Sequence, residues 1–293
     1  MRTLRGVATL SMMIVNTLLY AIPLCSAALV RLITPSSAHP HCTRFAMKCA
    51  EGWISNNNRI LDLLQALNVE CSYPQNLHPE QWYLVLCNHQ SWTDILILQR
   101  LFNKRIPMLK FFIKQSLIYV PILGACWWAL DFPIMKRYAP ATLKKKPHLR
   151  GRDLATTRRS CERFKLAPVS VLNFVEGTRF SHQKKMQSNS PFRHLLKPKS
   201  GGVAMVVDAL DEQLSAILDV TIIYHEYCPS FWTFLSGHAP KISVKIDSLP
   251  VPHNPTSDTN DAAKSSAVQV RELLAHRWLE KDATIQRELL EQS

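Results

Sequence analysis

The chain has 293 residues, enough for one sizeable hydrophobic core or for one domain with an additional anchoring segment. Charged residues make up 19% and hydrophobic residues 47% of the composition, which argues against a largely disordered protein. The formal net charge of +13 favours anionic partners, such as a membrane surface, nucleic acid, or phosphorylated and acidic substrates.

The N-terminal segment is long and apolar. Residues 6–30 contain no charged side chain, and 25 residues of helix can cross a hydrocarbon layer with some tilt. Arg2 and Arg5 precede this stretch and Arg31 follows it, so flanking charge does not define an orientation. The alternative is a cleaved signal peptide with a poor small-residue site at residues 25–27, but the apolar stretch is long for that role. We therefore predict a membrane anchor.

Residues 42–68 follow as an amphipathic helix, which either lies on a membrane or packs on the first helix. Beyond it, short apolar runs alternate with helical patterns, which predicts an α/β domain with a mainly parallel sheet flanked by helices. The predicted strands are residues 82–87, 169–175 and 220–224. The predicted helices are residues 94–102, 153–165 and 202–218.

The C-terminal part changes in composition. Residues 250–261 are rich in Pro, Asn, Ser and Thr and predict an exposed loop, and residues 262–291 predict a charged, peripheral helix. We therefore divide the chain into an anchor and amphipathic helix (1–68), an α/β domain (69–250), and a loop with a peripheral helix (251–293).

Eight cysteines are scattered along the chain, and no two have C-x-x-C spacing. Because several lie in apolar runs, we expect free thiols in a reducing compartment rather than a disulfide framework. His39, His41 and Cys42 lie close together but lack a second pair of ligands, so we expect no metal site there.

The first chemical motif is NHQSWTD at residues 88–94, directly after the first predicted strand. Ser91 and Asp94 have capping-box spacing before an apolar run, which predicts that Ser91 caps a helix with Asp94 in its first turn. His89 then lies in the preceding turn, where the chain can fold back and bring the imidazole to the carboxylate. Such a pair fixes the histidine tautomer and yields a general base. The alternative is a loop histidine whose hydrogen bonds are satisfied and which has no role in catalysis.

The second motif is FVEGTR at residues 174–179, after the second strong strand. Gly177 permits a tight turn, and Arg179 can hold a phosphate in a bidentate manner. Glu176 can orient Arg179 or accept a hydrogen bond from a substrate hydroxyl. A strand-end turn with a surface ion pair is the alternative interpretation.

Together these motifs resemble the glycerolipid acyltransferase family, which includes 1-acylglycerol-3-phosphate O-acyltransferase and is marked by N-H-x4-D and F-[PV]-E-G-T-R. The positions that match are Asn88, His89, Asp94, Phe174, Glu176, Gly177, Thr178 and Arg179. Between them, residues 114–124 look like the family's K-x-x-L-x-x-x-P-x-x-G segment, and residues 132–137 look like its second block, which ends at Arg137. The usual proline of the fourth block is missing near residues 220–221. The resemblance covers roughly residues 70–235, and a bacterial inner-membrane branch looks most similar.

The resemblance implies a reaction and roles for these residues. His89, held by Asp94, would take the proton from a lysophospholipid hydroxyl, which attacks the thioester of acyl-CoA or acyl-carrier protein. The foremost acceptor would be 1-acyl-sn-glycerol-3-phosphate. Arg137 and Arg179 would hold the substrate phosphate, while Asn88, Glu176, Gly177 and Thr178 would bind or orient the substrate. No cofactor and no metal ion are implied.

Charge and composition suggest the partners. Residues 136–165 contain eleven Lys or Arg and two acids, and residues 179–199 contain six and no acid. Beside an anchor, these runs favour an anionic membrane surface, although a solvated basic face is the simpler alternative. Nucleic acid is not favoured, because no nucleic-acid-binding motif accompanies the charge. We expect a protein of the cell inner membrane with a cytoplasmic catalytic domain. A hydrolase using the same His–Asp pair and a non-catalytic binder of anionic partners remain alternatives.

Overall fold

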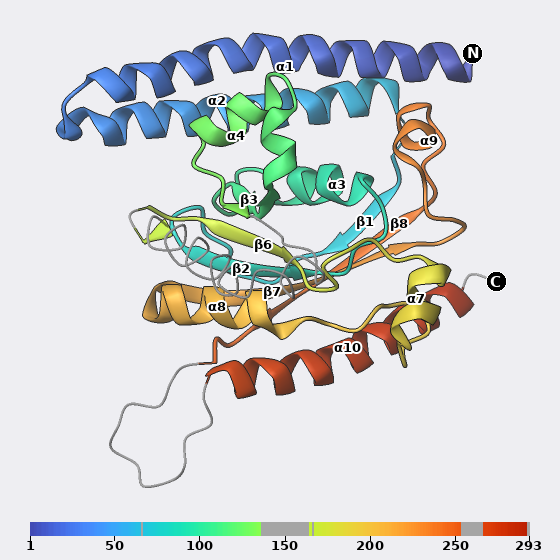
Figure 1. Cartoon of the computed structure of the whole chain (residues 1–293). Coiled ribbons are helices and arrows are strands. Elements are labelled where there is room, and N and C mark those ends of the chain that lie inside the picture. Colours follow the sequence, from blue (N-terminus) through green and yellow to red (C-terminus); the bar gives the residue numbers. More distant parts are fainter. Residues whose placement is uncertain (66, 136–163, 166, 253–265, 292–293) are drawn as a thin grey trace, which may run out of the picture.

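The computed structural model describes residues 1–65, 67–135, 164–165, 167–252 and 266–291. A helical hairpin lies on one side of a sheet, and the helices at residues 200–210 and 266–290 lie on the other side (Figure 1). The sheet strands are β1 (Val69–Ser72), β2 (Trp82–Cys87), β3 (Leu109–Phe111), β6 (Ser170–Phe174), β7 (Leu214–Tyr224) and β8 (Ile242–Leu249). Their spatial order is β1-β8-β7-β2-β6-β3, and every pair is parallel except β7 with β8. The predicted α/β class with a mainly parallel sheet is confirmed.

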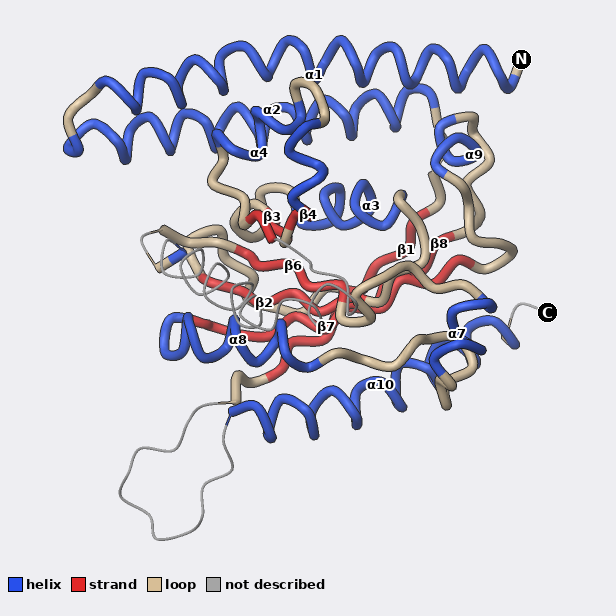
Figure 2. Tube along the Cα trace, viewed as in Figure 1, coloured by secondary structure: helices blue, strands red, loops and turns tan. Residues whose placement is uncertain are grey.

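Helices cover both faces of this sheet, which places the strands in the middle layer (Figure 2). The longer helices are α1 (Arg2–Ile33), α2 (His39–Leu64), α3 (Thr93–Phe102), α8 (Ser200–Leu210) and α10 (Ser266–Leu290). The shorter ones are α4 (Leu123–Ala129), α7 (His182–Ser188), α9 (Phe231–Leu235) and the 3₁₀ turns η1 (Ser36–Ala38), η2 (Gln115–Tyr119) and η4 (Asp211–Gln213). A separate parallel pair joins β4 (Ile113–Lys114) to β5 (Ile134–Met135).

The alternation of side chains along β2 divides the core into two halves. Tyr83, Val85 and Cys87 pack toward α3 and the hairpin, whereas Leu84 and Leu86 pack toward α8 and α10. Successive side chains of a strand point to opposite faces, so a continuous apolar run serves both halves. A third cluster joins the hairpin to α4 and Phe132.

Polar side chains tie α1 to α2. The Asn16 amide donates to the Trp53 carbonyl at 3.0 Å and to the Asn57 side-chain oxygen at 2.8 Å. The Trp53 indole N–H in turn donates to the Thr17 hydroxyl at 3.0 Å. These hydrogen bonds fix how α1 lies along α2. A buried amide without its hydrogen-bond partner costs free energy, so a shift of one helix along the other would be unfavourable. The second predicted helix therefore packs on the first, over residues 39–64 rather than 42–68.

Two predictions about helices were wrong. The helix predicted over residues 202–218 ends at Leu210, and β7 begins at Leu214 because the run from 214 onward pairs with β2 in the centre of the sheet. The C-terminal helix is not peripheral: Trp278, Val270 and Leu274 are fully buried in the core half that contains α8. The predicted helix at 153–165 and loop at 250–261 lie mostly outside the described residues. The domain boundaries stay a prediction.

Candidate active site

The site begins where β2 ends, at the carboxyl edge of the central strands. Asn88 follows Cys87 and is fully buried; its side-chain amide donates to the Ile222 carbonyl and accepts from the Ile222 N–H, each at 2.9 Å. The side chain thus makes the pair of hydrogen bonds that a neighbouring strand would make with Ile222, and it fastens the turn after β2 to β7. Because both ends of the amide are occupied and the side chain is buried, Asn88 holds the turn in place.

The Asp94 carboxylate organises the turn between β2 and α3. Its Oδ2 atom accepts from the backbone N–H groups of Gln90 at 2.7 Å and Ser91 at 2.9 Å. This is half of the predicted capping box, in which the acidic residue reaches back to the chain before the helix. The other half differs from the prediction: α3 begins at Thr93 with Trp92 as N-cap, and the Ser91 hydroxyl accepts from the Thr93 N–H at 3.3 Å while it donates to the Pro229 carbonyl at 2.6 Å.

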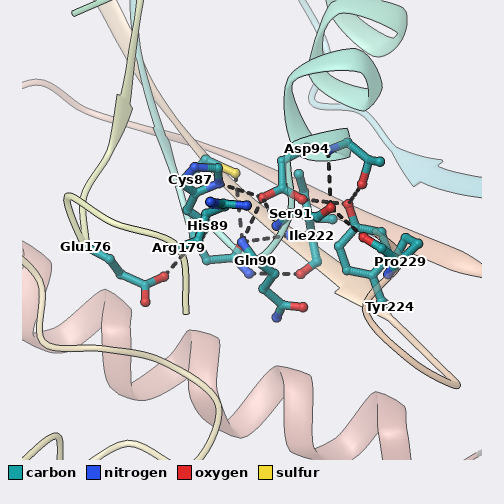
Figure 3. Close-up of polar contacts among 12 residues, drawn as sticks. Cys87, His89, Gln90, Ser91, Asp94, Glu176, Arg179, Ile222, Tyr224 and Pro229 are labelled. Carbon is teal, nitrogen blue, oxygen red and sulfur yellow. Dashed lines mark hydrogen bonds and ion pairs between the residues drawn. The ribbon is translucent and has the colours of Figure 1, made fainter. Parts of the chain in front are cut away.

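The same carboxylate meets the imidazole of His89, as the sequence predicts. His89 Nδ1 lies 2.8 Å from Asp94 Oδ2, and the two side chains are 14% and 1% exposed (Figure 3). An ionised Asp94 can only accept, so Nδ1 carries the hydrogen, and Nε2 is left as an acceptor with no partner among the described residues. The ring stacks on Phe174, with centroids 3.9 Å apart and planes 15° apart. The imidazole is therefore held on its edge and on one face.

Tyr224 completes the surroundings of Asp94, and the sequence interpretation missed it. Its hydroxyl donates to Asp94 Oδ1 at 2.5 Å and lies 2.8 Å from the Thr93 hydroxyl. Burial, reinforced by the nearby Asp94 charge, raises the pKa of Tyr224 well above its ordinary value, so the donor stays protonated. The sequence did contain a hint of this role, since Tyr224 is the aromatic residue at the carboxyl end of the third predicted strand, residues 220–224.

Glu176 braces the turn from the opposite side. One carboxylate oxygen accepts from the His89 N–H at 3.1 Å, and the other accepts from the Leu196 N–H at 2.8 Å. Burial raises the pKa of Glu176 to about 7, although these two N–H groups oppose the rise. The predicted contact with Arg179 is not formed in the described part of the chain, since both oxygens accept from backbone N–H groups; the predicted contact with a substrate hydroxyl stays a prediction.

Gly177 allows the chain to turn sharply after Glu176. Its φ of 71° lies in the left-handed region, and an added Cβ would approach the Lys199 ammonium to 3.1 Å. The next hydroxyl, on Thr178, accepts from the Lys184 ammonium at 2.7 Å, and Lys184 also donates to the Arg179 carbonyl at 2.9 Å. Thr178 thus shapes the loop that carries Arg179.

Arg179 is brought close to His89. The N–H of Phe180 donates to the His89 carbonyl at 2.7 Å, which fastens the loop directly beside the turn that follows β2. The guanidinium carbon lies 5.0 Å from the centre of the Trp92 ring. Within the described part of the chain Arg179 forms no ion pair, so its charge is available to an anion. Arg137, the other predicted phosphate ligand, lies outside the described residues.

An apolar cavity of about 620 Å³ adjoins this turn, between the hairpin and α3. Residues of α1 form one wall, and Trp92 of the turn and Phe231 of α9 also line it. Its other residues come mainly from α2, α3 and the segment 108–132 that includes α4. Its size is typical of small-molecule pockets, and its walls suit a hydrocarbon ligand. Among the described residues no group of three or more His, Cys, Asp or Glu could hold a metal ion.

Comparison with known proteins places this arrangement in context. A family model described as Acyltransferase matches residues 68–225. The 2-acyl-1-lysophosphatidylinositol acyltransferase of Saccharomyces cerevisiae is 27% identical over 248 residues, covering 70% of this chain and 60% of that protein. The 1-acyl-sn-glycerol-3-phosphate acyltransferase 3 of Arabidopsis thaliana is 26% identical over 178 residues, covering 56% of this chain and 44% of that protein.

The chain thus spans less than two thirds of the length of these curated relatives. Among solved structures, the crystal structure of the 1-acyl-sn-glycerophosphate acyltransferase PlsC from Thermotoga maritima superposes with a TM-score of 0.55 at 17% identity. The match covers 96% of this chain and 97% of that one, so the fold is shared almost throughout.

Proposed function

Because the chain belongs to the Acyltransferase family, we propose that it transfers a fatty acyl group from a thioester to the free hydroxyl of a lysophospholipid. The observation that carries this proposal is the contact between His89 and Asp94, which leaves the second imidazole nitrogen as an acceptor. In the same turn, Trp92 lines the apolar cavity and lies 5.0 Å from the Arg179 guanidinium carbon. The named relatives act on lysophosphatidylinositol and 1-acyl-glycerol-phosphate, which supports an acylated glycerophospholipid as acceptor. Our foremost candidate is 1-acyl-sn-glycerol-3-phosphate.

The chemistry needs no acyl-enzyme. His89 Nε2 takes the proton from the acceptor hydroxyl as its oxygen attacks the thioester carbonyl carbon, and Asp94 stabilises the imidazolium that forms. The tetrahedral intermediate collapses with cleavage of the C–S bond, and the departing sulfur takes the proton from His89. A diacyl lipid and a free thiol result, and the histidine returns to its starting state. The donor is acyl-CoA or acyl-carrier protein in this proposal, and no cofactor takes part.

Recognition of the two parts of the lipid would be divided. Arg179 would hold the phosphate, together with Arg137 as the resemblance implies. The 620 Å³ cavity would accept an acyl chain, since its lining is apolar and reaches Trp92 in the catalytic turn. Supporting residues act indirectly: Asn88, Glu176, Gly177 and Thr178 shape the turn and the loop.

A membrane location agrees with a lipid substrate. Helix α1 is long and apolar enough to cross a bilayer, and it exposes a row of large apolar side chains that includes Leu19 at 63% and Ile22 at 69%. Basic segments such as residues 179–199 would favour an anionic lipid surface. We place the protein at the inner membrane with the catalytic domain on the cytoplasmic side, consistent with the free cysteines among the described residues.

The test is an acyl-transfer assay on the membrane-bound protein with lysophosphatidic acid and other lysolipids. His89→Ala and Asp94→Ala should each lower kcat about a thousandfold, whereas His276→Ala, which changes an exposed histidine on α10, should leave it unchanged. Release of free fatty acid without diacyl product would instead identify a hydrolase. Transfer that survives in both site variants would refute the proposed mechanism, and a cellular effect retained by His89→Ala would favour a binding role.

A further inference from the structure

Helix α10 lies beyond residue 225, where the family match ends, yet it is bound to a segment that leads into the site. The Asp282 carboxylate accepts the backbone N–H groups of Arg193 at 2.8 Å and His194 at 2.7 Å, one on each oxygen. The indole N–H of Trp278, one turn earlier, donates to the Leu196 carbonyl at 3.0 Å. Two side chains of α10 therefore bind backbone groups of three residues in the segment 193–196: Arg193, His194 and Leu196.

From this segment the hydrogen bonds continue to the catalytic turn. The Leu196 N–H donates to Glu176 at 2.8 Å, and the other oxygen of Glu176 accepts the His89 N–H at 3.1 Å. Leu196 thus presents its carbonyl to Trp278 and its N–H to Glu176. The path from α10 to the residue that carries the imidazole passes through one backbone unit and one carboxylate.

The burial of α10 makes this attachment rigid. Trp278 is fully buried, and Lys281 is 3% exposed with its ammonium 2.6 Å from both the Val220 carbonyl and Asp219 Oδ1. Val220 pairs with Cys87 in the sheet, two residues before His89. An ammonium buried there also opposes, by its charge, the rise in the pKa of Glu176. A helix that only covered a sheet face would need none of these polar contacts.

We propose that α10 positions the catalytic turn, with Asp282 and Trp278 as positioning residues that fix the segment 193–196, and through Glu176 the backbone of His89. The proposal rests on the proposed acyl transfer for its kinetic consequence. Its structural consequence, the coupling of Asp282 to the His89 amide, does not depend on that reaction. Neither residue touches substrate in this scheme, so loss of either should impair the chemical step rather than substrate binding.

The kinetic test compares variants of the full-length protein in membranes. Asp282→Ala should lower kcat about tenfold while KM for acceptor and donor changes less than about twofold. Asp282→Asn keeps one acceptor oxygen, so its kcat should lie between that of Asp282→Ala and that of wild type. Glu288→Ala is the matched control: it removes another contact of α10, the 2.5 Å ion pair with Lys245 of β8, which does not lead to Glu176. An unchanged kcat in Asp282→Ala, or an equal loss in Glu288→Ala, would overturn the proposal.

Amide hydrogen exchange in the absence of substrate separates positioning from acyl transfer. In Asp282→Ala the amides of Arg193 and His194 lose their acceptor in any case, so the informative amide is that of His89, in a different element. We expect its exchange to rise about tenfold, with Glu288→Ala unchanged at the same site. Trp278→Phe, which removes the indole N–H donor together with part of a buried ring, should show the same pattern. If the His89 amide keeps wild-type protection in Asp282→Ala and Trp278→Phe, α10 does not position the turn, whatever reaction the protein catalyses.

Discussion

The Tyr224 hydroxyl donates a 2.5 Å hydrogen bond to the Asp94 oxygen that His89 does not use. Tyr224 ends β7, whereas Asp94 lies in the first turn of α3, so this bond joins the two sides of the site. It also keeps the buried carboxylate from rotating, because each oxygen has its own donor. The arrangement of the His89–Asp94 pair thus depends on β7 as well as on β2 and α3.

Tyr224→Phe tests this dependence. We expect kcat to fall about tenfold with little change in KM, and stability to fall by roughly 1–3 kcal/mol, because a buried acceptor loses its donor. Tyr227→Phe is the control, since its hydroxyl bonds the His238 carbonyl at the surface. Steady-state kinetics and chemical denaturation measure both effects. A variant that loses stability at unchanged kcat would show that Tyr224 serves the fold alone.

Glu176 predicts a pH dependence of stability. Its pKa of about 7 in the folded protein exceeds the ordinary value of 4.5, so the folded state binds the proton more tightly than the unfolded state. The contribution to stability is therefore complete below about pH 4.5 and is lost as pH rises through about 7, by on the order of 3 kcal/mol. The free energy of unfolding of wild type minus that of Glu176→Gln should decline over this window.

Glu288 provides the contrast for this measurement. Its hydrogen bond with Lys245 lowers the pKa of Glu288 below 4.5, so its contribution is present above that pH and is lost on acidification. The difference between wild type and Glu288→Gln should therefore grow with pH, opposite in sign to the Glu176 series. Two parallel profiles would mean that Glu176 is not buried as the structure has it.

Filling the apolar cavity should shorten the preferred acyl chain. Leu96 of α3 lines the cavity, and Leu96→Trp would occupy part of its 620 Å³. We expect kcat/KM for long-chain substrates to fall about tenfold or more relative to short-chain ones, since each excluded methylene costs binding energy. Leu96→Ala, which enlarges the cavity, should shift the preference in the opposite direction. Equal losses for all chain lengths would argue that acyl chains bind elsewhere.

The outer face of α1 should govern membrane binding. Leu19 and Ile22 are exposed and do not line the cavity, so Leu19→Glu with Ile22→Glu changes the surface alone. Binding to anionic vesicles should fall about tenfold or more, because two apolar side chains no longer enter the bilayer. Leu279→Glu, at an exposed site on α10, should bind as wild type does. Flotation assays give the comparison, and unchanged flotation of the double variant would place the membrane contact on another surface.

Parts of this architecture could be predicted because the signal is local. The apolar run of β2 followed by His89 and Asp94 defines a strand, a turn and a helix start within thirteen residues of chain, 82–94. The β1, β3 and β8 strands were not predicted: two are very short, and β8 alternates apolar residues with polar ones such as Lys245 and Asp247 instead of forming a continuous apolar run. Periodicity also could not separate the end of α8 from the start of β7, because both are apolar.

The supporting contacts of the site are the part that local pattern cannot supply. Tyr224 lies 130 positions from Asp94, and Asp282 lies 88 positions from His194. Only the packing of the sheet and of α10 brings such residues together. The motif singles out Asn88 and Glu176, but their partners are backbone groups of Ile222, His89 and Leu196, which carry no sequence signature. Their assignment to orientation of the turn therefore needed coordinates.

The double use of α1 has a practical consequence for anyone who purifies this protein. One face meets the exterior, but the opposite face, from Leu10 to Leu24, forms a side of the apolar cavity. A shortened protein starting after Ile33, the common remedy for poor solubility, would open that side to water. It would retain the residues of the His89–Asp94 pair but lack one wall of the proposed acyl-chain site. Solubilisation by detergent, with the helix intact, is the treatment that preserves both.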